Sequence, residues 1–99
     1  MGDRIMICIG CAGGESLAAA VAREIPVERI ACMNVCSAPV SVAARAEGKA
    51  AYLFTGVDPD RPQDIVAFAR LFAAAPDGEI ADARPAGELR FCLAGRIPA

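Results

Sequence analysis

The stretch IMICIGCAGG, residues 5–14, decides how the fold of this chain begins. Its first five residues form a short apolar run typical of a buried strand, and glycines at three of the next five positions indicate a tight loop. Residues 15–25 then place apolar side chains at helical spacing until Pro26 ends the run. We therefore predict a strand, a glycine-rich loop and a helix in direct succession.

The next part of the chain predicts a second strand and then a hairpin. Residues 27–32 are strand-like and complete a βαβ unit over residues 4–32. Apolar and polar residues alternate over 40–47, and a second apolar run occupies 50–54. This pattern predicts a β-hairpin whose turn lies at residues 47–49.

A second helix is expected over residues 61–75. Asp60 and Gln63 have the spacing of a capping box, and apolar residues then recur at helical positions. The last twenty residues fit either a strand or a helix, and Pro85 and Gly95 favour a short helix there.

The element order βαβ, β-hairpin, α is that of a thioredoxin-like domain. We therefore predict an α/β fold, a thioredoxin-like βαβ-ββα sandwich with a short C-terminal extension, as a single domain over residues 1–99. The small hairpin is expected to have an exposed edge, which is compatible with a homodimer.

The composition argues against several classes of function. The formal net charge is −2, which argues against binding to nucleic acid or to an anionic membrane surface. The chain contains no histidine, so Ser/His and Cys/His catalysis and His-ligated zinc are excluded. The apolar run at residues 5–9 is too short for a signal peptide or a membrane span, and we expect a cytoplasmic protein.

Five cysteines carry the candidate chemistry. Four have the spacing Cys8-x2-Cys11-x20-Cys32-x3-Cys36, and Cys92 stands apart. Two close pairs in a cytosolic chain indicate a metal site more than a disulfide framework. Each pair lies at the end of an expected strand, and neighbouring parallel strands end at the same edge of a sheet, so the four sulfur atoms are expected to converge. The alternative is that cysteines pack as small apolar side chains, which suits Cys92.

The surroundings of the paired cysteines suggest how an anionic site would be stabilised. Gly13 and Gly14 allow close backbone approach, and the first turn of the helix directs N–H groups toward the loop. Glycines alone fit an ordinary strand-to-helix turn equally well. No Lys or Arg lies within either pair, so we expect amide groups to compensate the negative charge of the site. Arg4 and Arg45 are further candidates for this role, but arginines at such positions are more often solvated side chains.

Several short segments together carry a resemblance to a known family. They are Cys8-Ile9-Gly10-Cys11, Cys32-Met33-Asn34-Val35-Cys36, Gly48-Lys49 with Tyr52-Leu53-Phe54, Phe68-Ala69-Arg70, Pro76-Asp77-Gly78 and Arg96-Ile97-Pro98. Nearly the whole chain resembles domain of unknown function 1636, a small bacterial family described as predicted metal-binding. That family is similar in turn to the thioredoxin-like 2Fe-2S ferredoxins. The resemblance implies Cys8, Cys11, Cys32 and Cys36 as cluster ligands and a link to cobalamin or cobalt metabolism.

Three functions remain open at this point. The first is a 2Fe-2S protein that carries single electrons to a redox partner protein and is not itself an enzyme. The second is a metal-delivery protein or a zinc protein in which four cysteines hold the ion. The third is a dithiol oxidoreductase, because Cys8-x-x-Cys11 precedes a helix as the reactive pair of thioredoxins does, and Pro39 stands where thioredoxins place a cis-proline.

Overall fold

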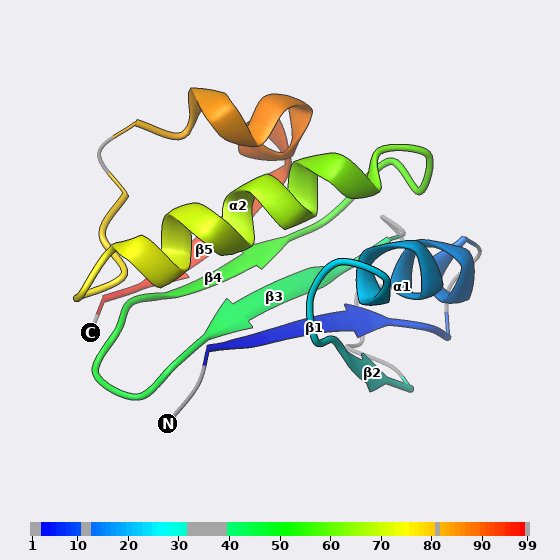
Figure 1. Ribbon diagram of the computed structural model, residues 1–99, viewed down its shortest axis with the longest axis horizontal. Helices are drawn as coiled ribbons and strands as arrows, with labels where there is room; N and C mark the ends of the chain where they lie inside the picture. Colours follow the sequence, from blue (N-terminus) through cyan, green and yellow to red (C-terminus); the bar gives the residue numbers. More distant parts are fainter. Residues whose placement is uncertain (1–2, 11–12, 32–39, 81, 99) are drawn as a thin grey trace.

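The chain folds around a five-stranded mixed sheet with the strand order β2-β1-β3-β4-β5 (Figure 1). The computed structural model describes residues 3–10, 13–31, 40–80 and 82–98. The elements follow one another as β1 (Arg4–Cys8), α1 (Gly14–Ala22), β2 (Glu28–Ile30), β3 (Val42–Arg45), β4 (Ala51–Phe54), α2 (Pro62–Ala74), the 3-10 helical segment η1 (Arg84–Cys92) and β5 (Leu93–Ile97).

Strand β1 lies inside the sheet, between β2 and β3. It runs parallel to β2 and antiparallel to β3, and β3, β4 and β5 are antiparallel neighbours. A tight turn, closed by a 3.1 Å hydrogen bond from the Lys49 N–H to the Ala46 carbonyl, joins β3 to β4. The structure therefore confirms an α/β fold with the expected βαβ-ββα order, consistent with a small thioredoxin-like domain.

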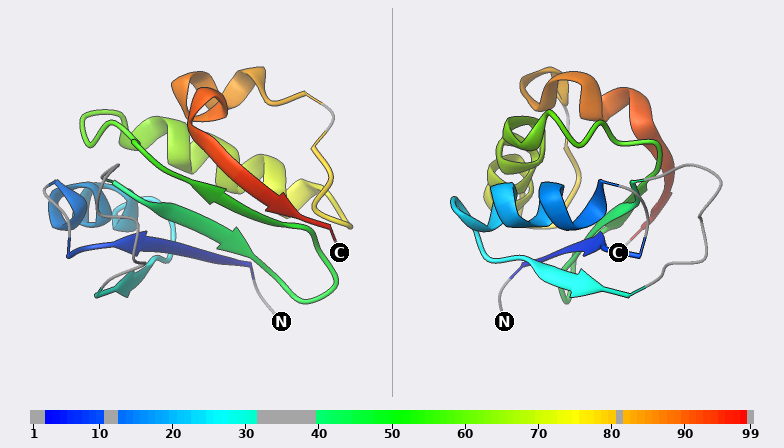
Figure 2. Two further views of the ribbon diagram at one scale, coloured as in Figure 1. Left: turned by 180° about the vertical axis from the view of Figure 1, so that it is seen from behind. Right: turned by 90° about the vertical axis from the view of Figure 1, so that its right-hand side faces the viewer.

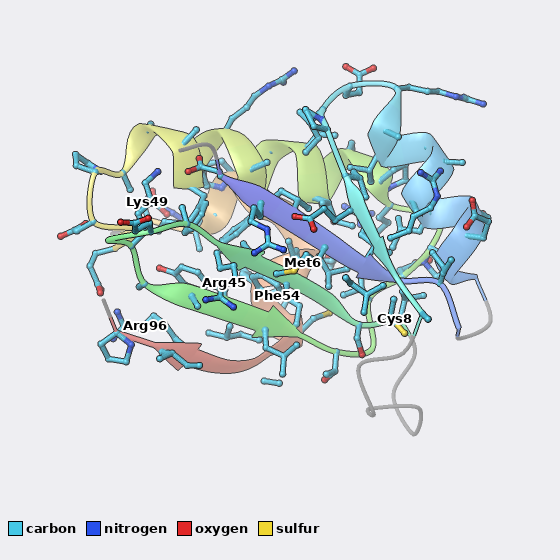
Figure 3. All side chains as sticks on the ribbon, turned by 90° about the horizontal axis from the view of Figure 1, so that it is seen from below. Met6, Cys8, Arg45, Lys49, Phe54 and Arg96 are labelled. Carbon is cyan, nitrogen blue, oxygen red and sulfur yellow. The ribbon has the colours of Figure 1, made fainter. Side chains whose placement is uncertain are left out.

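The helices α1 and α2 and the segment η1 lie on one side of the sheet (Figures 1 and 2). The core forms between these layers, where Ile7, Leu17, Ile65 and Phe72 are inaccessible to solvent. On the opposite face, the described part of the chain contributes no helix, and that face is seen directly in Figure 3. None of the described helices is long and apolar enough to cross a bilayer.

The boundaries of the expected elements are confirmed to within a few residues, but the expected helix cap is wrong. The first turn of α2 follows Arg61, and no side chain caps it. The Asp58 carboxylate instead accepts a 2.8 Å hydrogen bond from the Asp60 N–H. Asp58 thus stabilises the turn before the helix, and the Asp60–Gln63 spacing has no capping role.

The C-terminal region contains both a helical segment and a strand. The helix favoured by Pro85 is present as η1, which is broken at Gly87, where φ is 63°. After η1 the chain enters β5, which pairs with β4 and becomes an edge of the sheet. The edge of the β3–β4 hairpin that we expected to be exposed is therefore paired, and the sheet ends at β2 and β5. Homodimer formation stays a prediction.

Glycine at position 14 is required by the contact between α1 and β1. A Cβ atom at Gly14 would lie 2.0 Å from the Cys8 carbonyl oxygen and 3.0 Å from the Ile9 Cα. Both obstacles are backbone atoms, which cannot rotate away as a flexible side chain would. The first turn of α1 consequently sits directly against the carboxyl end of β1.

We predict that Gly14→Ala destabilises the protein by about 3 kcal/mol, because the added methyl group forces the helix away from the strand. For a domain of this size, that change lowers the Tm by more than about 10 °C. The matched control is Gly95→Ala in β5, where a Cβ meets nothing within 4 Å and the expected change is below about 0.5 kcal/mol. Thermal unfolding followed by circular dichroism distinguishes them, and equal Tm values for the two variants would contradict the close contact.

Candidate metal site at the carboxyl end of β1

Cys8 is the last residue of β1, and its side chain is almost completely buried, with 1% of its surface exposed. Its N–H donates a 2.9 Å hydrogen bond to the Ser41 carbonyl, and it is paired with Ile30 of the parallel strand β2. Ile5 and Ile7 belong to the main core cluster, and side chains alternate along a strand. Cys8 therefore belongs to the sheet face opposite the helices, near the end of the sheet (Figure 3).

The other three predicted ligands cannot be compared with Cys8 directly. Cys11, Cys32 and Cys36 lie outside the described residues, as does Pro39. Their convergence with Cys8 stays a prediction. What the structure does describe is where the chain enters and leaves the two segments that contain them.

The residues on either side of those segments all lie near the carboxyl end of β1. The Ile9 N–H donates a 2.8 Å hydrogen bond to the Ile30 carbonyl. One residue further on, a Cβ at Gly10 would lie 2.1 Å from the Ala31 carbonyl oxygen, so Gly10 and Ala31 are in backbone contact. The residues that immediately precede Cys11 and Cys32 in the sequence are thus neighbours in space.

The far ends of the same two segments also meet. A Cβ at Gly13 would lie 3.0 Å from two side-chain atoms of Pro59 and 3.7 Å from a methyl carbon of Val40. Gly13 follows Cys11 by two residues, and Val40 follows Cys36 by four. Both cysteine-containing segments therefore begin and end at one edge of the sheet.

The described part of this edge combines backbone groups with an ion pair, in which Arg29 Nε on β2 donates a 3.0 Å hydrogen bond to Glu15 in the first turn of α1. The amino end of α1, which carries the positive end of the helix dipole, packs against Cys8 through Gly14. Arg4 and Arg45 are register partners at the other end of β1 and β3. Arg4 also donates two hydrogen bonds to Glu28, of 2.5 and 2.9 Å, which raise the pKa of Arg4 and lower the pKa of Glu28. Arg4 and Arg45 therefore do not compensate charge at Cys8.

Ser41 is a second unusual side chain at this edge. It is fully buried, with 0% of its surface exposed, and its hydroxyl is the single buried side-chain N or O atom without a hydrogen-bond partner among the described residues. In the sequence, Ser41 is the polar partner of an alternating strand, a pattern that indicates an exposed position. The pairing of β3 with β1 places Ser41 beside Cys8, and neither this position nor its burial is indicated by the local sequence.

Away from Cys8, a concave site with a volume of about 400 Å³ lies beside Cys92, between α2 and η1. Its carboxylates have structural roles: Asp64 accepts a 2.7 Å hydrogen bond from Arg61 Nε and a 3.1 Å hydrogen bond from the Glu88 N–H. Across the described ranges, no three His, Cys, Asp or Glu side chains form a group that could hold a metal ion. This cleft is therefore not a candidate metal site.

Comparison with known proteins identifies one family. The model of a protein family of unknown function, DUF1636, matches residues 9–99. The match contains Cys11, Cys32, Cys36 and Ser41 and begins one residue after Cys8. No curated protein and no solved structure matches the chain significantly.

We predict that Cys92 is a poor nucleophile at neutral pH. Partial burial raises the pKa of its thiol, and Glu88, Asp64 and Asp58 add to the rise, so less of the thiol is ionised at about pH 7.5 than in an ordinary cysteine. Alkylation of Cys92 by iodoacetamide, followed by mass spectrometry, is expected to be slower in the folded protein than in urea and to accelerate above about pH 9. Equal rates in both states at neutral pH would contradict this assignment.

Proposed function

We propose that this chain, which belongs to the DUF1636 family of proteins of unknown function, binds a 2Fe-2S cluster through Cys8, Cys11, Cys32 and Cys36 and carries single electrons. The observation that supports this proposal is that the residues that flank both cysteine-containing segments meet at the edge where Cys8 is buried. The resemblance to thioredoxin-like ferredoxins suggests the type of cluster.

Covalent connectivity limits how far apart the proposed ligands can lie. Consecutive Cα atoms are about 3.8 Å apart, and Cys11 and Cys32 each directly follow a residue of the contacting pair Gly10 and Ala31. Cys36 belongs to the segment that starts at Ala31 and returns to Val40. A shared coordination shell therefore requires no change in the described sheet.

The donor set fits an iron-sulfur cluster. Four thiolates without histidine are the usual ligands of a 2Fe-2S cluster, and the absence of histidine excludes the ligand sets that contain it. A zinc ion would use the same four thiolates, so the donor set alone does not separate these two metals. Cys8 comes from a hydrogen-bonded strand that fixes its position. Its burial excludes water from one side of the site, which together with amide hydrogen bonds sets the reduction potential.

When bound, such a cluster takes up and releases one electron at a time. In this proposal the electron comes from a low-potential donor protein and passes to an acceptor enzyme, and the chain itself makes or breaks no substrate bond. Its residues hold the ligands, exclude water and present the site at an edge of the sheet. The acceptor is proposed to belong to cobalamin or cobalt metabolism, as the family resemblance suggests.

The burial of Cys8 favours a ligand role over disulfide exchange. An attacking or attacked sulfur must be reachable by the substrate, and reactive cysteines are partly exposed. Cys8 is 1% exposed and ends a paired strand, whereas metal ligands are commonly buried. The dithiol oxidoreductase is therefore the weaker interpretation of the Cys8-x-x-Cys11 pair.

The first test is anaerobic purification of the chain followed by analysis of iron, sulfide and zinc. We expect a coloured protein with about two iron atoms and two sulfide ions per chain, and an S = 1/2 EPR signal after reduction with dithionite. Replacing any one of Cys8, Cys11, Cys32 and Cys36 by serine is expected to remove most of the iron. The matched control, Cys92→Ser, keeps it.

Other results would select the alternatives. A colourless protein with one zinc ion per chain would replace the cluster by a structural or delivery zinc site. A metal-free protein that reduces insulin, with activity unchanged by Cys32→Ser, would instead establish the dithiol oxidoreductase.

A second prediction tests the meeting of the two segments. In Gly10→Ala the new methyl group overlaps the Ala31 carbonyl oxygen, so the residues that lead into Cys11 and Cys32 must separate. We expect the variant to lose at least about half of its iron while it keeps a folded circular dichroism spectrum, since the core on the other sheet face is unchanged. Gly95→Ala is again the control. Full iron content in Gly10→Ala would contradict the proposed ligand geometry.

A further inference from the structure

The unpartnered hydroxyl of Ser41 requires an explanation. Buried polar side chains nearly always have a hydrogen-bond partner, and an exception indicates strain, an ordered water, or a ligand. Ser41 is 0% exposed, and within the described residues its Oγ atom has no partner. Alanine at this position would avoid the cost of burying the hydroxyl, so the hydroxyl itself is the feature to explain.

Ser41 lies directly across from Cys8. The register of β1 and β3 pairs Ile7 with Val42, and the 2.9 Å hydrogen bond from the Cys8 N–H to the Ser41 carbonyl continues that register by one residue. Opposed residues in antiparallel strands project on the same face, with Cβ atoms about 4.5 to 5.5 Å apart. The Ser41 side chain therefore leaves the sheet on the same face as the Cys8 side chain.

That face is opposite the main core. Val42 and Ile7, the next pair along, both belong to the core cluster under the helices, so the pleat directs Cys8 and Ser41 to the other side. A hydroxyl beside a sulfur ligand can donate a hydrogen bond to that sulfur or to a second sulfur atom bound close by. In iron-sulfur sites such hydrogen bonds are one of the determinants of the reduction potential.

We propose that the Ser41 hydroxyl donates a hydrogen bond to a sulfur atom of the cluster bound at Cys8 and thereby raises its reduction potential. This inference rests on the proposed function. Reduction adds one electron to the site and breaks no bond, and the added negative charge strengthens a hydrogen bond to sulfur. The donor therefore stabilises the reduced state more than the oxidised state.

The experiment compares Ser41→Ala with Ser16→Ala, which removes a hydroxyl from an exposed position on α1. Both anaerobic proteins are titrated with dithionite, and the reduced cluster is monitored by EPR. We expect Ser41→Ala to lower the equilibrium constant for one-electron reduction about tenfold, which corresponds to a shift of about 59 mV to lower potential. Ser16→Ala is expected to leave the reduction potential unchanged. Ser41→Thr keeps a hydroxyl, and its reduction potential is expected to stay close to that of the wild type.

A spectroscopic readout tests the hydrogen bond itself. In H2O the reduced protein is expected to show a proton coupling that disappears on exchange into D2O, and this coupling is expected to be absent in Ser41→Ala and retained in Ser41→Thr. An unchanged potential in an iron-loaded Ser41→Ala variant would overturn the proposal. If Ser41→Ala loses the cluster, an iron-loaded Ser41→Thr variant without the exchangeable proton coupling would overturn the proposal as well.

Failure of this inference can be distinguished from failure of the proposed function. If the wild-type chain holds the cluster but Ser41→Ala has the same reduction potential as the control Ser16→Ala, the carrier function stands and the proposed hydrogen bond does not. If the chain holds zinc, the carrier function fails, and the role of Ser41 is tested by zinc affinity, which Ser41→Ala is expected to lower and Ser16→Ala to leave unchanged. A chain that binds neither metal overturns both.

Discussion

The carboxyl end of β1 is fixed by contacts between backbone atoms, and the rest of the proposed site depends on them. Gly10 lies against the Ala31 carbonyl and Gly14 against the Cys8 carbonyl, at separations that leave no room for a Cβ atom. No side chain stands between these segments, so they cannot slide apart by changing a rotamer. The strand, the helix start and the end of β2 therefore form one rigid unit around Cys8.

These contacts also define which charges can act on Cys8. The amino end of α1 is brought against β1, whereas Arg4 and Arg45 are located at the other end of their strands. Among the described residues, this edge thus supplies amide dipoles, the Ser41 hydroxyl and an arginine, Arg29, that is already paired with Glu15. If a cluster binds here, these groups would stabilise its negative charge less strongly than an unpaired cation, which would favour a low reduction potential and would give a single added hydrogen bond a measurable effect.

The features that could be predicted from the sequence are those whose signals are local. The helical spacing of residues 61–75 depends on neighbouring residues, and the structure confirms that helix. Leu93–Ile97 was missed as a strand because it forms through pairing with β4, about forty residues earlier along the chain. Residue type and spacing make Cys8 a predicted ligand, which the structure leaves as a prediction, whereas no local signal indicates the burial of Ser41, since a serine in an alternating strand normally faces water. The role that we propose for its hydroxyl depends on the register that places Ser41 opposite Cys8, and register is a long-range property of strand pairing.

A metal at this edge would also resolve a problem of stability. A domain of 99 residues rich in alanine has a thin core. If the four cysteines converge as we propose, they cannot all be thiolates in a buried site without a cation, so a metal-free edge would hold neutral thiols beside the unpaired Ser41 hydroxyl. Binding of the proposed metal group would exchange protons for metal-sulfur bonds and would give Ser41 an acceptor. Because the proposed ligands come from both ends of a βαβ unit, the binding energy would add to the stability of the fold. Electron transfer and folding would then depend on the same sulfur atoms.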